Sequence, residues 1–157
     1  MNNYLNVLEE SLYKKLVVLN KIQEYNDKQS KCFISDNVDV EGFDAAIEEK
    51  GKLIEELNKL DEGFETLYAN ISEQLKRDKD QYAHQIKRLQ ELVRQVTEKS
   101  LSVQASESRN KALVEAYFSK EKKQIKEGRV SSKVAFGYYQ NLNKAILENN
   151  RGFDFKK

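Results

Sequence analysis

The chain has 157 residues, of which 34% are charged and 39% hydrophobic, and it contains neither proline nor tryptophan. A compact domain of this length usually holds about 45–50% apolar and about 25% charged residues, so the composition excludes a thick globular core and favours slim, exposed helices. The formal net charge is +1, but residues 1–75 hold 8 basic and 16 acidic side chains (net −8), whereas residues 76–157 hold 19 and 10 (net +9).

The first expected helix covers residues 3–33. Its apolar side chains recur at steps of three and four, which places them on one face: Leu5, Leu8, Leu12, Leu16, Leu19 and Ile22. The sequence SDNVD that follows is rich in turn and capping residues, and we predict that Asp39 is the N-cap of the next helix.

The second expected helix covers residues 40–76 and is the most regular. Its predicted heptad seam consists of Phe43, Ala46, Lys50, Leu53, Leu57, Leu60, Phe64, Leu67 and Ile71. Lys50 interrupts this seam once, and we interpret it as a residue that sets the register. Gly63 costs about 1 kcal/mol of helix propensity; it is either a site of close helix approach or a tolerated imperfection.

A helix–helix turn is expected at 76–80, where five charged residues, KRDKD, follow one another and the seam loses phase. Asp78 or Asp80 is the predicted N-cap of the third helix. The alternative is one continuous helix over 40–127, about 130 Å long, which would have to dimerise to cover its seam.

The third expected helix covers residues 81–127, with Tyr82, Ile86, Leu89, Val93, Val96, Ser100 and Val103 on its seam. The small and polar stretch SLSVQASESRNK at 100–111 thins the seam, and Gly128 is expected to end the helix. If the basic third helix runs antiparallel to the acidic second one, their charges specify the pairing, and the last ~15 Å of the third helix overhangs.

Residues 129–157 hold five of the fifteen aromatic side chains. An isolated helix of this length is marginal in water, so we expect a partly flexible, aromatic and basic tail that forms a short helix over 132–147 when it docks. The predicted fold is therefore all-α: an elongated antiparallel bundle of three long, coiled-coil-like helices over residues 1–128, followed by the tail.

Side chains that could carry chemistry are few. His84, the only histidine, is expected on the solvated surface, and Cys32 lacks the spacing of a zinc or redox site. We therefore predict no enzymatic activity, no metal and no cofactor. A single cysteine, the lack of a secretory leader pattern and the lack of a long apolar run lead us to expect a cytoplasmic protein that does not insert into membranes.

Two kinds of partner remain. Nucleic-acid binding has some support in the basic half, but its charges are interleaved with acids and no nucleic-acid module is present, so we expect none. The end of the third helix and the tail are the better candidate, because there the aromatic side chains either pack back onto the bundle or meet an incoming helix. The candidate partner-binding residues are Leu113, Val114, Tyr117, Phe136, Tyr138, Tyr139 and Leu142.

Three segments resemble the FlgN/FliT-type flagellar export chaperones, in the form found in clostridia and related Gram-positive bacteria. They are EEKGKLIEELNKLDEGFETLY at 48–68, QIKRLQELVRQVTEKSLSVQASESRNK at 85–111 and SSKVAFGYYQNL at 131–142. The resemblance covers about residues 41–144. It implies a small, all-helical cytoplasmic protein, without reaction or cofactor, that binds the C-terminal amphipathic helices of hook-associated proteins or filament subunits. Such proteins prevent early assembly and deliver their clients to the type III export gate.

Two hypotheses follow. The first is an export chaperone, monomeric or weakly homodimeric, whose third helix and tail contact the client. The second is a structural coiled-coil scaffold or homodimer without a secretion client. The sequence leaves open whether the tail docks on the bundle in the free protein.

Overall fold

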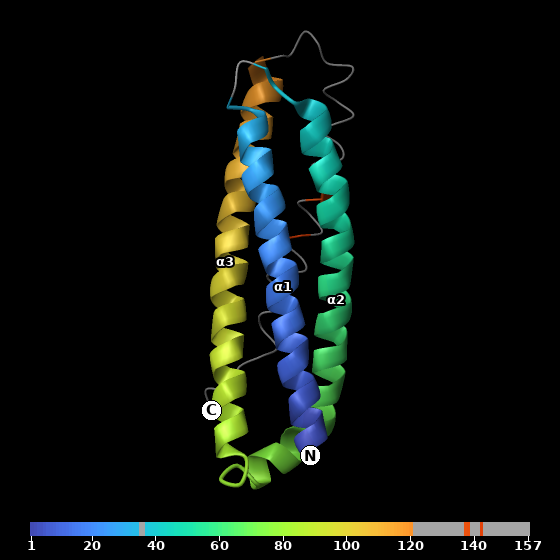
Figure 1. Ribbon diagram of the computed structural model, residues 1–157, viewed down its shortest axis with the longest axis vertical. Coiled ribbons are helices and arrows are strands. Elements are labelled where there is room, and N and C mark those ends of the chain that lie inside the picture. Colours follow the sequence, from blue (N-terminus) through green and yellow to red (C-terminus); the bar gives the residue numbers. More distant parts are fainter. Residues whose placement is uncertain (35–36, 121–136, 139–141, 143–157) are drawn as a thin grey trace.

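Three long helices make up almost all of the computed structural model, which describes residues 1–34, 37–120, 137–138 and 142. They are α1 (Asn2–Cys32), α2 (Val40–Arg77) and α3 (Ala83–Lys120), and no strand occurs among the described residues. The helices run along the long axis of a slender molecule (Figure 1). The prediction of an all-α, elongated helical bundle is confirmed.

Helix α1 lies between the other two. The chain ascends along α1, descends along α2 and ascends again along α3, so α2 is antiparallel to both of its companions (Figure 1). Helix α1 packs extensively against α2 and against α3, whereas α2 and α3 have no comparable close packing against each other. The expectation that acidic second and basic third helices pair face to face is therefore wrong, because α1 separates most of their length.

The helix ends follow from local capping. Oδ1 of Asp39 accepts a hydrogen bond of 2.8 Å from the backbone N–H of Gly42, which confirms Asp39 as the N-cap of α2. The backbone N–H of Asp78 donates to the carbonyl of Gln74, so Asp78 closes α2 instead of opening α3. The Asp78 carbonyl then accepts from the N–H groups of Gln81 and Tyr82, and the chain turns at 78–82 instead of continuing as one helix.

The seam of α2 differs from the predicted one at three positions, Leu53, Leu60 and Leu67. Phe43, Lys50, Leu57, Phe64 and Ile71, which are seven residues apart, are buried as expected. Between them Ala46 is buried as predicted, and Ile47, Ile54 and Asp61 are buried as well. Leu53, Leu60 and Leu67 are only half-buried. The buried positions therefore lie one residue later than the predicted ones in this part of the seam. The half-buried leucines lie at the edge of the core.

The end of α3 packs on the connection between α1 and α2. The ring centroid of Tyr117 lies 5.3 Å from that of Phe33 and 5.2 Å from that of Phe118. The rings of Phe33 and Phe43 meet edge to face, with their centroids 5.0 Å apart. Over the described residues α2 and α3 both have 38 residues. The predicted overhang falls mostly on residues 121–127, which lie outside the described residues. Within the described part of α3, Tyr117 and Phe118 have intramolecular contacts.

Candidate functional site

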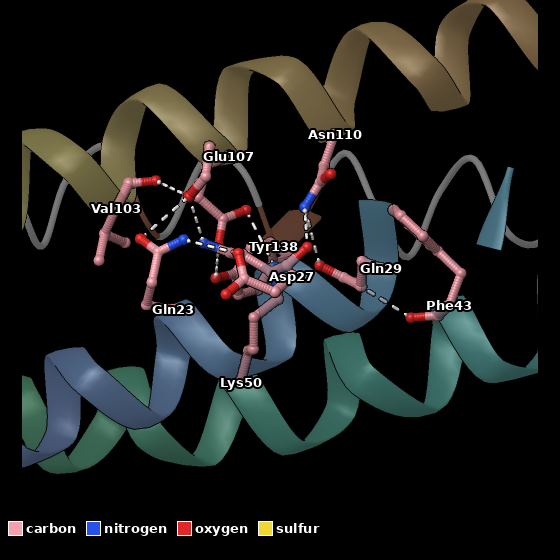
Figure 2. A network of polar contacts seen from close by, with 11 residues as sticks. Gln23, Asp27, Gln29, Phe43, Lys50, Val103, Glu107, Asn110 and Tyr138 are labelled. Atoms are coloured by element: carbon pink, nitrogen blue, oxygen red, sulfur yellow. Dashed lines mark hydrogen bonds and ion pairs between the residues drawn. The ribbon is translucent and has the colours of Figure 1, made fainter. Parts of the chain in front are cut away.

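A network of buried polar side chains centred on Lys50 lies between the helices of the bundle (Figure 2). The Nζ atom of Lys50 donates to Oδ1 of Asn26 at 2.7 Å and to the two carboxylate oxygens of Glu107 at 2.8 and 3.0 Å. The Lys50 side chain is 0% exposed and that of Glu107 3%. The ion pair therefore joins α2 to α3 across a space that water does not reach.

Tyr138, which follows the three helices in the sequence, completes this centre. Its ring centroid lies 4.3 Å from Nζ of Lys50, and its hydroxyl donates to Oε1 of Glu107 at 2.7 Å. The ammonium thus has a ring face in addition to its oxygen acceptors. Because Tyr138 is only 6% exposed and Leu142 only 1%, these two residues belong to the core.

Amide and hydroxyl groups extend the network along α1 and α3. Asn26 donates from Nδ2 to Oγ of Ser106 at 2.8 Å, and Ser106 donates to the carbonyl of Val103 at 2.9 Å. Asn110 donates to the carbonyl of Asn26 at 3.1 Å. On the same side Gln29 donates to the carbonyl of Phe43 at 3.1 Å. The polar stretch of α3 therefore continues the core, because its buried polar groups have partners.

A second buried ion pair joins α1 to α2. Nζ of Lys15 lies 2.5 Å from Oδ1 of Asp61, with side chains 5% and 3% exposed. Lys50 and Asp61 stand eleven residues apart on α2, about 16 Å along the helix axis. A slip of α2 against its neighbours would bury both charges without their counter-ions, so the two pairs together specify one register.

Burial controls the charge state of Lys50. Desolvation lowers the pKa of its ammonium from 10.5 to about 8, against the opposing effect of the Glu107 carboxylate, which raises it. Between these two pH values the unfolded chain binds a proton that the folded chain has released. The free energy of unfolding therefore rises with pH across this window.

We expect a gain on the order of 1–3 kcal/mol in the free energy of unfolding as the pH rises from about 8 toward 10.5. Urea unfolding followed by circular dichroism at a series of pH values measures it. The reference is the Lys50→Met/Glu107→Leu variant, since burial-raised pKa values of Cys32 and Tyr68 act in the opposite direction in both proteins. Identical pH profiles of the two proteins would contradict the assignment.

The predicted partner-binding residues fall into two groups. Val114 is buried, and Leu113 and Tyr117 are half-buried at the end of α3. Tyr138 and Leu142 lie in the core, and Tyr138 contacts Glu107, ten residues or about 15 Å below Tyr117. The structure therefore does not bring the five described residues of this set into one exposed surface. Phe136 and Tyr139 lie outside the described residues.

The network itself is the part that sequence reasoning missed. Lys50 is a predicted register residue, but the heptad pattern of α2 does not identify its partner. A signal was present: Ser100, Val103, Glu107, Asn110 and Val114 continue the steps of three and four through the polar stretch. A carboxylate at such a seam position, with a lysine at a seam position of another helix, indicates a buried ion pair.

The remaining candidate groups have ordinary surroundings. His84 is exposed, as predicted, and Cys32 is a half-buried free thiol. Over the described parts of the chain, no three His, Cys, Asp or Glu side chains are grouped so that they could hold a metal ion. Within the same parts, no helix combines the length and the apolar character needed to cross a membrane.

The fold and the network define an elongated helical bundle whose three helices are registered by buried polar contacts. A family model described as FlgN protein matches residues 1–132, and the chain belongs to the FlgN family. This is a family of flagellar export chaperones, and the resemblance noted from the sequence is confirmed. No curated protein and no solved structure matches the chain.

The family match extends farther toward the N-terminus than the resemblance did. It includes all of α1, which the resemblance matched only in pattern, and it ends before Tyr138 and Leu142. The two C-terminal residues that complete the core are therefore outside the part of the chain that defines the family.

Proposed function

We propose that the protein is a cytoplasmic chaperone of the flagellar type III export pathway, which binds the C-terminal amphipathic helices of hook-associated proteins or filament subunits. It keeps these clients from assembling early and delivers them to the export gate. The observation that carries the proposal is the family match over residues 1–132. Neither a reaction nor a cofactor is part of this function.

The physics of a thin bundle supports this role. A client terminus that is disordered when free gains apolar burial when it folds as a helix on the bundle, but it also loses conformational entropy. The affinity therefore stays moderate, and the client can be released at the export gate. Leu113 and Tyr117 are candidate client contacts without any rearrangement, because both are half-buried. Tyr138 and Leu142 would contribute only if they leave the core, since both are buried.

The test is binding of synthetic peptides to the full-length protein. Fluorescently labelled peptides from the C-termini of hook-associated proteins and flagellin are expected to bind, and peptides from the N-termini of the same proteins serve as controls. Sedimentation shows whether one protein chain binds one peptide. A tight homodimer that excludes all the peptides would support the structural scaffold instead and contradict the proposal.

A shortened chain that ends at Gly128 tests the role of the C-terminal residues. If Tyr138 and Leu142 leave the core to contact the client, the shortened chain remains helical by circular dichroism and loses most of its client binding. Undiminished binding of the C-terminal peptides by the shortened chain would exclude a role for the tail, while leaving the chaperone function in place.

A further inference from the structure

The outer groove between α1 and α2 is lined by the leucines that the core leaves half-buried. One hollow of about 230 Å³ lies between the first half of α1 and the second half of α2, and its apolar lining includes Val7, Leu60 and Leu67. A second hollow of about 400 Å³ lies farther along the same pair of helices and includes Tyr25 and Leu53. The two hollows together follow the groove for most of the length of α1.

The lining repeats with the period of a coiled coil. Leu53, Leu60 and Leu67 are seven residues apart, so they recur about every 10.5 Å along the groove. An apolar series at this spacing forms one side of a coiled-coil interface with a further helix. On α1 the apolar lining consists of Val7, Leu8 and Tyr25. From Val7 to Lys28 the groove is about 32 Å long, which suits a helix of about 20 residues.

The charges at the rim favour one kind of occupant. On α1, Lys14, Lys21 and Lys28 line the hollows at the same spacing of seven, with Glu10 and Glu24 beside them. On α2 the rim is balanced, with two lysines and two glutamates: Lys52, Lys59, Glu49 and Glu56. A helix in the groove meets this row of ammonium groups on its α1 side. Lys14 already pairs with Glu10 at 3.3 Å, and carboxylates at heptad spacing on the helix would add pairs with the row.

We propose that the α1–α2 groove is the docking surface for one amphipathic helix of a partner protein, about 20 residues long, with an apolar heptad seam and carboxylates on the flank that faces α1. The proposal rests on the proposed function in that the helix is the client's. A second copy fits less well, because two concave grooves provide no ridge to fill each other. The chain's own Tyr138 contacts Lys50 and Glu107, which line neither hollow.

Gly63 gives a direct way to block the groove. It lines the first hollow, it is exposed, and a Cβ atom placed on it would meet no heavy atom within 4 Å. The idea that this glycine permits a close helix approach is therefore wrong. Gly63→Trp places a bulky side chain in the hollow without disturbing the core. Ala105→Trp, on the exposed face of α3, is the matched control.

The probe is a labelled, designed 21-residue helix with leucines at its heptad seam and glutamates on one flank, and a second peptide carries lysines instead. We expect the glutamate peptide to bind the full chain, to bind Gly63→Trp at least about tenfold more weakly, and to bind Ala105→Trp normally. The lysine peptide should bind about threefold more weakly than the glutamate peptide, and this difference in affinity should become smaller at high salt.

Equal binding of the glutamate peptide to both tryptophan variants would overturn the proposal. So would sedimentation that shows a dimer of the wild-type protein which Gly63→Trp, but not Ala105→Trp, dissociates. The hook-associated peptides separate this proposal from the proposed function. If they bind the wild-type protein and Gly63→Trp equally well, the groove is excluded and the function stands. If only the designed helix binds, and only where the groove is open, the groove stands and the function fails.

Discussion

Replacing Lys50 with methionine is expected to lower the free energy of unfolding by about 3–5 kcal/mol, because the Glu107 carboxylate then stays buried without its cation. The reverse replacement, Glu107→Leu, leaves the ammonium in the same position and should cost a similar amount. The double variant Lys50→Met/Glu107→Leu removes both charges and is expected to lose less than either single variant, because only the neutral hydrogen bonds of Asn26 and Tyr138 are then missing.

Urea unfolding followed by circular dichroism measures all three variants at one pH. Lys52→Met, two residues along the same helix, is the control, since its side chain is 73% exposed and its replacement should change the stability by less than about 0.5 kcal/mol. The buried pair would lose its assigned role if Lys50→Met were tolerated as well as Lys52→Met, or if the double variant lost the sum of the two single losses.

Phe43→Ala is the second change with a large expected effect, about 3–5 kcal/mol of unfolding free energy. Phe43 is 2% exposed, its ring meets that of Phe33, and its carbonyl accepts the hydrogen bond of Gln29. Truncation therefore leaves a cavity where the ends of the three helices meet. Phe33, which packs on Phe43, also contacts Tyr117 at the end of α3.

The same unfolding measurement serves for this variant, with thermal unfolding as a second readout. Leu101→Ala is the control for loss of an apolar side chain, since Leu101 is 57% exposed and its truncation should cost less than about 0.5 kcal/mol. Similar losses for Phe43→Ala and Leu101→Ala would mean that the aromatic cluster does not hold the helix ends together.

The sequence predicts the helices well because the signals for them are local. The spacing of Leu5, Leu8 and Leu12 places one apolar face on α1, and Asp39 supplies a side-chain cap next to the helix it begins. Which face of α2 turns inward is not a local property. Steps of three and of four from Phe43 both yield an apolar series, and only the position of α1 selects Ile47 and Ile54 over Leu53 and Leu60.

The candidate site was less accessible to sequence reasoning. Pairing Lys50 with Glu107 requires knowing which helices meet at one level of the bundle, and the net charges of the two halves predicted a different arrangement. The Lys50–Glu107 ion pair even opposes that trend, since the acidic half supplies the lysine and the basic half supplies the glutamate. Bulk charge describes the exposed faces, whereas the buried pairs depend on individual positions.

The central position of α1 also determines the order in which the register can form as the chain is synthesised. The pair of Lys15 with Asp61 lies within the α1–α2 hairpin, so it can form once the first two helices have left the ribosome. Lys50 has no carboxylate partner until Glu107 follows much later in the chain, and Tyr138 arrives last. The alignment of the first two helices can therefore form before the third helix is synthesised, and Glu107 and Tyr138 add their contacts to Lys50 afterwards.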